Sequence, residues 1–161
     1  MKPTYVTDEV LEGLKKLPTA TVYNAVRYFG STLCVCEGLQ NFTPGQKMAA
    51  RAKTLRFLPH RADLKTDTPQ GENAPEYVAM GKCGPGDVLV ADLQSRTQDV
   101  VAGDVKLLQL KMNNAAGVVI DGAIRDLDVL DAIEVMENEI DEVPETTTVS
   151  LVTILKAVHI D

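Results

Sequence analysis

Two short motifs contain residue types that could bind a small anion and a hard metal ion. Gly103-Asp104 comes first, and Arg125-Asp126 follows later in the chain. A glycine followed by an acid is typical of a helix start, where backbone N–H groups can bind a carboxylate. The carboxylates of Asp104 and Asp126 suit a hard divalent cation. A 2-oxo acid would match both features, because its carboxylate suits the N–H groups and its keto oxygen can share the cation.

These residues can be given chemical roles. Asp126 is the first choice as direct metal ligand, and Asp104 is expected to hold metal-bound water. The guanidinium of Arg125 could stabilise the enolate that forms when a carbon–carbon bond beta to the keto group breaks. The same enolate forms in retro-aldol cleavage and in decarboxylation of a 2-oxo acid. The residue types therefore point to one reaction class.

Each motif also has a plainer interpretation. Arg125-Asp126 could be only a turn with a surface ion pair, and Gly103-Asp104 only an ordinary helix start. Asp92 and Asp121 each end a predicted strand and could have no further role. Residue types and spacing leave these alternatives open.

The elements that must position the motifs are predicted from apolar patterning. Asp87–Asp92 and 117–121 read as strands, and Gly84-Pro85-Gly86 as a turn. Gly103-Asp104 opens the helix between the strands, and this helix carries Val105, Leu108 and Met112. A strand, a helix and a strand with short links predict two parallel strands in a βαβ unit. Ligands of such units bind beyond the carboxyl ends of the strands, where Asp92 and Asp121 lie.

The flanking segments complete an α/β pattern. One helix is expected after Thr7 and another from Thr19 or Thr21 to Gly30, with an apolar stripe of Val22, Ala25, Val26 and Phe29. A strand is expected within 48–58, with loops over 31–46 and 59–75.

Residues 126–155 contain nine acids and no Lys, Arg or His. They predict an acidic amphipathic helix followed by a closing strand over 146–155.

Composition limits the class of protein. We expect 161 residues to form a single domain, 1–161, with N-terminal helices over 1–30, a core over 48–126 and an acidic tail over 127–161. The net charge of -7 argues against nucleic acid as a partner. Because no signal segment or membrane-length apolar run is present, a cytoplasmic protein with no membrane partner is expected. Cys34, Cys36 and Cys83 are expected to be reduced thiols.

Gly103-Asp104 together with Gly117–Asp126 resembles the signature of the 4-hydroxy-4-methyl-2-oxoglutarate aldolase and regulator of ribonuclease activity A family. Leu17–Ala25 and Gly84–Asp92 are similar to the family's early helix and central strand. The resemblance implies a swivelling β/β/α-type domain assembled as homotrimers or hexamers, with sites between subunits and Mg²⁺ or Mn²⁺ as cofactor. It also implies a class II, metal-dependent lyase that cleaves 4-hydroxy-2-oxo acids to pyruvate and decarboxylates oxaloacetate.

By position, Arg125 matches the family's enolate-stabilising arginine, Asp126 its metal-binding aspartate and Asp104 the acid that orients metal-bound water. The amides of Gly103, Asp104, Val105 and Lys106 match the loop that grips the pyruvate carboxylate. Beyond Asp126 the chain departs from the family's pattern, in the half that supplies an acid to the neighbouring subunit's site. The alternative is therefore a non-catalytic relative that regulates a partner such as a ribonuclease.

Overall fold

The structure is a computed structural model that describes residues 6–31, 35–36, 39–63, 68–94, 96, 99–126 and 153–157. Its helices are α1 (Asp8–Lys15), α2 (Thr19–Tyr28), α3 (Pro75–Gly81) and α4 (Asp104–Met112), with a short 3-10 helix η1 (Gly71–Asn73). Its strands are β1 (Leu39–Asn41), β2 (Arg51–Arg56), β3 (Asp87–Asp92), β4 (Val100–Ala102), β5 (Gly117–Asp121), β6 (Ala123–Ile124) and β7 (Thr153–Ala157). The predicted α/β class is confirmed.

The larger sheet has five strands in the order β1-β7-β5-β3-β2. Four of its strands, β2, β3, β5 and β7, run parallel to one another, and β1 pairs antiparallel with β7. Both β3 and β5 have the predicted bounds, and their predicted parallel pairing is confirmed, with Asp92 opposite Asp121. Parallel strands covered on both faces are expected to be mostly apolar, as these two are.

A second sheet of two strands, β4 and β6, was not predicted. We expected β3 to lead into α4 through a short link, but β4 lies between them. A strand of three residues is too short to show a repeating pattern in the sequence. Its place matters because β4 ends immediately before Gly103 and β6 immediately before Arg125.

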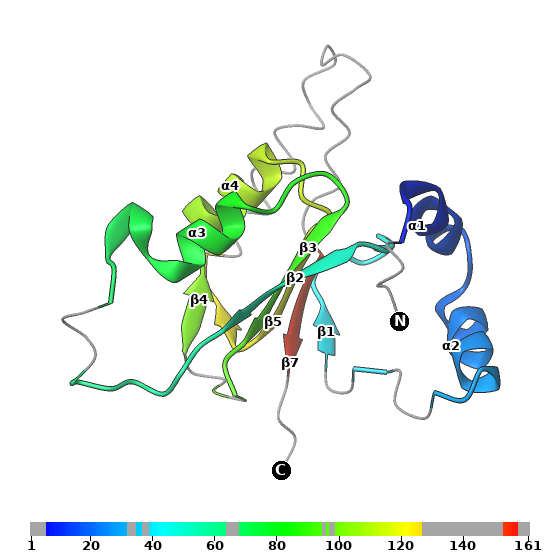
Figure 1. Cartoon of the computed structure of the whole chain (residues 1–161), viewed down its shortest axis with the longest axis horizontal. Coiled ribbons are helices and arrows are strands. Elements are labelled where there is room, and N and C mark those ends of the chain that lie inside the picture. Colours follow the sequence, from blue (N-terminus) through cyan, green and yellow to red (C-terminus); the bar gives the residue numbers. More distant parts are fainter. Residues whose placement is uncertain are drawn as a thin grey trace.

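The main core lies between the larger sheet and the helices α3 and α4, which cover one side of that sheet in Figure 1. Its largest fully buried side chains are no more than 1% exposed and are Met80, Leu89, Leu107, Leu110, Val118 and Ile120. Since burying one such side chain contributes roughly 1.5–3 kcal/mol, this layer supplies most of the apolar stabilisation.

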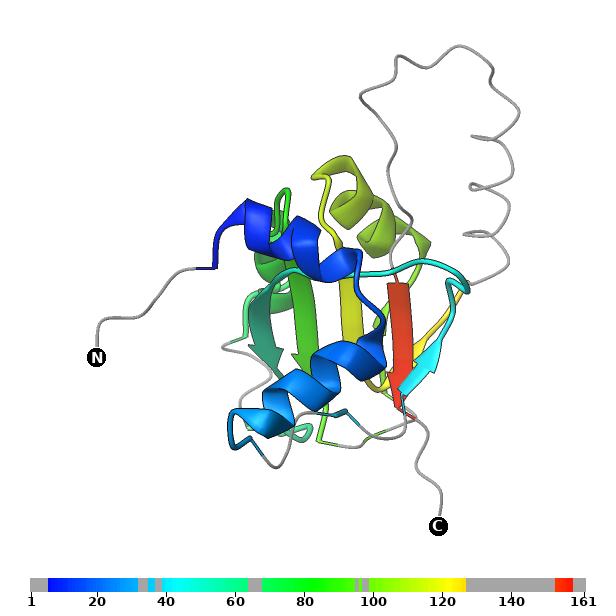
Figure 2. The ribbon, with the colours of Figure 1, turned by 90° about the vertical axis from the view of Figure 1, so that its right-hand side faces the viewer.

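The helices α1 and α2 lie on the opposite side of the sheet, in front of it in Figure 2. The predicted start of α1 is confirmed, since the Thr7 hydroxyl accepts a hydrogen bond from the Val10 amide at 3.4 Å. Only Leu11 of α1 is buried, and no residue of α2 is. The predicted apolar stripe of α2 is thus not a buried stripe here, and Phe29 at its end is 84% exposed.

Three sequence-based expectations need correction. The helix α4 turns Leu107 and Leu110 inward, while Val105, Leu108 and Met112 are 63%, 39% and 75% exposed. Both stripes of α4 are apolar, so packing on the sheet rather than patterning decides which one is buried. The other two corrections are elements that were missed: β1 lies within a predicted loop, and η1 and α3 begin within another.

The tail prediction is tested only at its end. A strand does occur there, but β7 spans Thr153–Ala157, later than the predicted 146–155. The predicted acidic helix and residues 146–152 lie outside the described residues. Among the helices that the structure describes, none is long and apolar enough to cross a membrane.

Candidate functional site

The two short strands of the second sheet bring the sequence motifs together. β4 pairs in parallel with β6, with Val100 opposite Ala123. Gly103 follows β4 and Arg125 follows β6, and the Arg125 amide donates to the Ala102 carbonyl at 3.2 Å. The N-terminal end of α4 therefore lies beside the Arg125-Asp126 pair.

Gly103 packs directly against that pair. It is buried, and a Cβ at this position would overlap Asp126 Oδ2 and lie 3.1 Å from Arg125 Cγ. Its φ of -139° is open to any residue. A side chain at this position would therefore have to displace Asp126 and Arg125, so the close approach of these side chains, and not the backbone conformation, favours glycine here.

Asp126 has an uncommon backbone conformation, with φ at +62°. Aspartate is one of the few residues that tolerate this left-handed region. Its Oδ2 lies 3.1 Å from Arg125 Nε, with the Arg125 side chain 71% exposed and that of Asp126 37% exposed. An ion pair this exposed contributes no more than about 1 kcal/mol, so a ligand can replace either partner at small cost.

Asp104 is the first residue of α4, and its carboxylate Oδ1 accepts a hydrogen bond from the Val105 amide at 2.7 Å. This contact agrees with the plainer interpretation of Asp104 as part of a helix start. It also occupies one amide of the predicted carboxylate-binding turn. A bound carboxylate would use the other amides of that turn or displace the Asp104 side chain.

The Lys106 side chain turns away from the motif. Its Nζ donates to Glu76 Oε1 at 3.1 Å and to the Val101 carbonyl at 3.0 Å, and lies 5.0 Å from the centroid of the Tyr77 ring. Its backbone amide remains the group by which Lys106 could bind a substrate. Sequence reasoning missed Glu76 and Tyr77 because it did not predict α3, although Pro75 followed by an acid is a helix-start signal.

The strand-end residues have structural contacts. Asp92 Oδ2 lies 2.9 Å from Arg56 Nε, and its Oδ1 accepts from the Gln94 amide at 2.8 Å. Gly122, which follows Asp121, is buried, and a Cβ there would lie 2.7 Å from Leu93 Cδ2. The plainer interpretation of Asp92 as the end of a strand is supported. Gly122 allows β5 to turn into β6 against the core.

Cys36 and Cys83 are free thiols, and Cys34 lies outside the described residues. Burial, and to a lesser degree the charge of Asp87, raise the pKa of the Cys83 thiol. Its Sγ donates to the Ala79 carbonyl at 3.5 Å. Cys83 is thus a core residue and a poor nucleophile, since the reactive form of cysteine is the thiolate.

The donors near Gly103 suit a hard cation that keeps most of its coordination for water and substrate. Among the described residues, no group of three or more His, Cys, Asp or Glu side chains could hold a metal ion. Mg²⁺ is commonly bound through one or two carboxylates, with water and substrate as its other ligands. Asp126, whose Oδ2 lies beside Gly103 at the start of α4, fits that arrangement.

The fold and this cluster define an α/β protein with a candidate anion-binding and cation-binding site at the start of one helix. Residues 19–152 match the profile of the RraA-like family, described as Aldolase/RraA. The chain belongs to this family, as its motifs suggested.

Among curated proteins, the chain is similar to one from Halalkalibacterium halodurans named "Putative 4-hydroxy-4-methyl-2-oxoglutarate aldolase". The two are 42% identical over 57 residues, which cover 35% of this chain and 27% of the relative. The aligned region is thus a minor part of that protein.

Two solved structures share the fold. One is Streptomyces coelicolor RraAS2, described as an unusual member of the RNase ES inhibitor RraA protein family, with a TM-score of 0.68 and 22% identity. The other is an uncharacterized protein from Pseudomonas syringae pv. tomato, with a TM-score of 0.70 and 20% identity. The matches cover 96% and 99% of this chain but only 64% and 61% of those chains. The chain therefore spans less than two thirds of either structure.

Proposed function

We propose that this protein is a divalent-metal-dependent lyase that cleaves 4-hydroxy-2-oxo acids to pyruvate and decarboxylates oxaloacetate. The observation that supports this most is the packing of Gly103 against both Arg125 and Asp126. Residues far apart in the sequence thereby form one cluster of a helix N-terminus, a guanidinium and a carboxylate. These groups are complementary to a 2-oxo acid and a hard cation.

The chemistry follows from where charge develops. In the retro-aldol reaction the bond between C3 and C4 breaks, and its electron pair becomes the enolate of pyruvate. The 4-hydroxyl loses its proton and becomes a carbonyl, while C3 later gains a proton. Arg125 stabilises the negative charge on the enolate oxygen, and Asp104 would hold the water that receives the proton. Oxaloacetate gives the same enolate when carbon dioxide leaves.

Asp126 would hold the metal ion, proposed to be Mg²⁺ or Mn²⁺. When bound, the ion supplies Lewis acidity toward the keto oxygen. The first-turn amides of α4 bind the substrate carboxylate. We also propose that the chain assembles as homotrimers or hexamers with sites between subunits, and light scattering can test this assembly.

The test is pyruvate release from oxaloacetate with Mg²⁺ or a chelator, corrected for the metal-catalysed reaction without protein. We expect Arg125→Ala to lower kcat by about 10²-fold or more, as does loss of other groups that stabilise an oxyanion. Arg61→Ala is the matched control, because Arg61 is also an exposed arginine that pairs with a nearby aspartate, Asp63. Equal rates for wild type and Arg125→Ala, with or without metal, would contradict the proposal.

A second candidate is a non-catalytic regulator of a ribonuclease. The description of the Streptomyces fold relative as a member of an RNase inhibitor family favours it. A regulator would bind its partner without metal and would not need Arg125. Inhibition of a ribonuclease that survives both chelation and Arg125→Ala, in a protein that releases no pyruvate, would select this alternative.

A further inference from the structure

Lys106 connects three elements at the start of α4. Its ammonium group contacts Glu76 and Tyr77 of α3 and the Val101 carbonyl of β4, at 3.1 Å, 5.0 Å and 3.0 Å respectively. The side chains of Lys106 and Glu76 are each only 20% exposed. A lysine held by a carboxylate, a carbonyl and an aromatic face is restrained in position and well compensated for its partial burial.

One residue that Lys106 contacts, Val101, is close in the chain to residues of the candidate site. Lys106 holds Val101, and the next residue, Ala102, accepts the Arg125 amide. Gly103 follows and touches the side chains of Arg125 and Asp126. The side chain of Lys106 therefore links the two ends of the segment 101–106, and Arg125 contacts the middle of this segment.

We propose that Lys106, held by Glu76 and Tyr77, is a positioning residue that fixes the first turn of α4 relative to Arg125 and Asp126. Its effect on catalysis rests on the proposed lyase function, whereas its effect on position rests on the contacts alone. Displacing a substrate-binding group by about 1 Å can slow a reaction by about 10²-fold, so such a restraint matters for rate.

The test compares Lys106→Met, which keeps most of the unbranched side chain and removes its charge, with Lys106→Arg, which keeps the charge. Glu76→Gln removes the same ion pair from the other side. Lys15→Met is the matched control, because Lys15 pairs with Glu12 on α1 at 2.6 Å, away from α3 and α4. The full chain is used throughout, and circular dichroism checks that each variant is folded.

The first measurement is hydrogen–deuterium exchange of the segments 100–107 and 122–126. We expect Lys106→Met and Glu76→Gln to speed exchange in both segments by about tenfold, because local opening of the first turn becomes easier. Lys106→Arg and Lys15→Met should exchange there at the wild-type rate. Wild-type exchange in Lys106→Met and Glu76→Gln would overturn the proposal, whatever the activity of the protein.

The second measurement separates kcat from KM for pyruvate release. We expect Lys106→Met to lower kcat by about tenfold and to change KM by less than threefold, with Lys106→Arg restoring most of the rate. Faster exchange with an unchanged kcat would overturn the catalytic effect and leave a structural contact. If the wild type releases no pyruvate, the proposed lyase function fails, while the exchange result still decides whether Lys106 positions the turn.

Discussion

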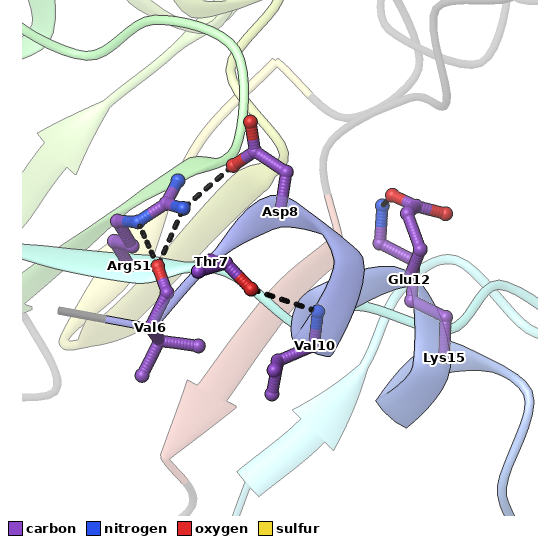
Figure 3. Close-up of polar contacts among 7 residues, drawn as sticks. All are labelled: Val6, Thr7, Asp8, Val10, Glu12, Lys15 and Arg51. Carbon is purple, nitrogen blue, oxygen red and sulfur yellow. Dashed lines mark hydrogen bonds and ion pairs between the residues drawn. The ribbon is translucent and has the colours of Figure 1, made fainter.

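The starts of α1 and α4 each contact the rest of the fold through one basic side chain, but the two helices differ in how much apolar surface they bury. Arg51 of β2 donates to the Val6 carbonyl at 2.7 and 3.0 Å and pairs with Asp8 at 2.6 Å, as Figure 3 shows. Lys106 makes its comparable contacts with Glu76 and Val101.

The difference lies in burial. The helix α4 places Leu107 and Leu110 in the main core, whereas α1 buries only Leu11. Asp8 is 85% exposed in its ion pair, while Glu76 is 20% exposed. A polar link at α1 is thus a large part of what holds a weakly packed helix. A similar link at α4 sets the position of a helix that the core already holds.

The largest effect that tests this comparison should come from removing core contacts. Leu110→Ala deletes a side chain that is 0% exposed and should lower the free energy of unfolding by about 2–5 kcal/mol. Leu11→Ala removes an equivalent side chain from α1 and should cost clearly less, because α1 packs on a smaller buried surface. Urea unfolding followed by circular dichroism measures both. Equal losses would contradict the difference between the two regions.

The same contrast explains what the sequence could reveal. The strands β3 and β5 were predicted with correct bounds, because compact apolar runs between turn residues are a strong local signal. The start of α1 at Thr7 was equally clear. Neither the inward side of α4 nor the exposure of α2 could be predicted, since both depend on which surfaces the sheet offers.

The candidate site shows the same limit. Sequence reasoning assigned Gly103 and Arg125 to one ligand-binding site, and the structure does bring them close together. It could not find the β4–β6 pairing that aligns them, because strands this short have no pattern. Glu76 and Tyr77 were missed for a related reason, since a contact between α3 and α4 is not a local property of either segment.

An effect of intermediate size is expected from glycine substitutions, which compare the candidate site at the start of α4 with α1. Gly103→Ala places a methyl group onto Asp126 Oδ2 and should weaken Mn²⁺ binding by about tenfold or more, which corresponds to about 1.4 kcal/mol. Gly13→Ala is the control in α1, where nothing lies within 4 Å of the new methyl group. It should stabilise that helix by about 0.5–1 kcal/mol and leave Mn²⁺ binding unchanged. Calorimetry measures binding, and unchanged affinity in Gly103→Ala would argue against Asp126 as the metal ligand.

The smallest effect is expected from breaking the polar link at α1. Arg51→Met removes the contacts with Val6 and Asp8 and should lower the free energy of global unfolding by less than about 1 kcal/mol, because the ion pair is exposed. Hydrogen exchange of 8–15 should nevertheless rise several-fold, since α1 has little buried surface to hold it in place. Exchange within α4 should not change. If Arg51→Met loosened α4 as much as α1, the two helix starts would belong to one cooperative unit, and the distinction between a link that holds a helix and one that positions it would be wrong.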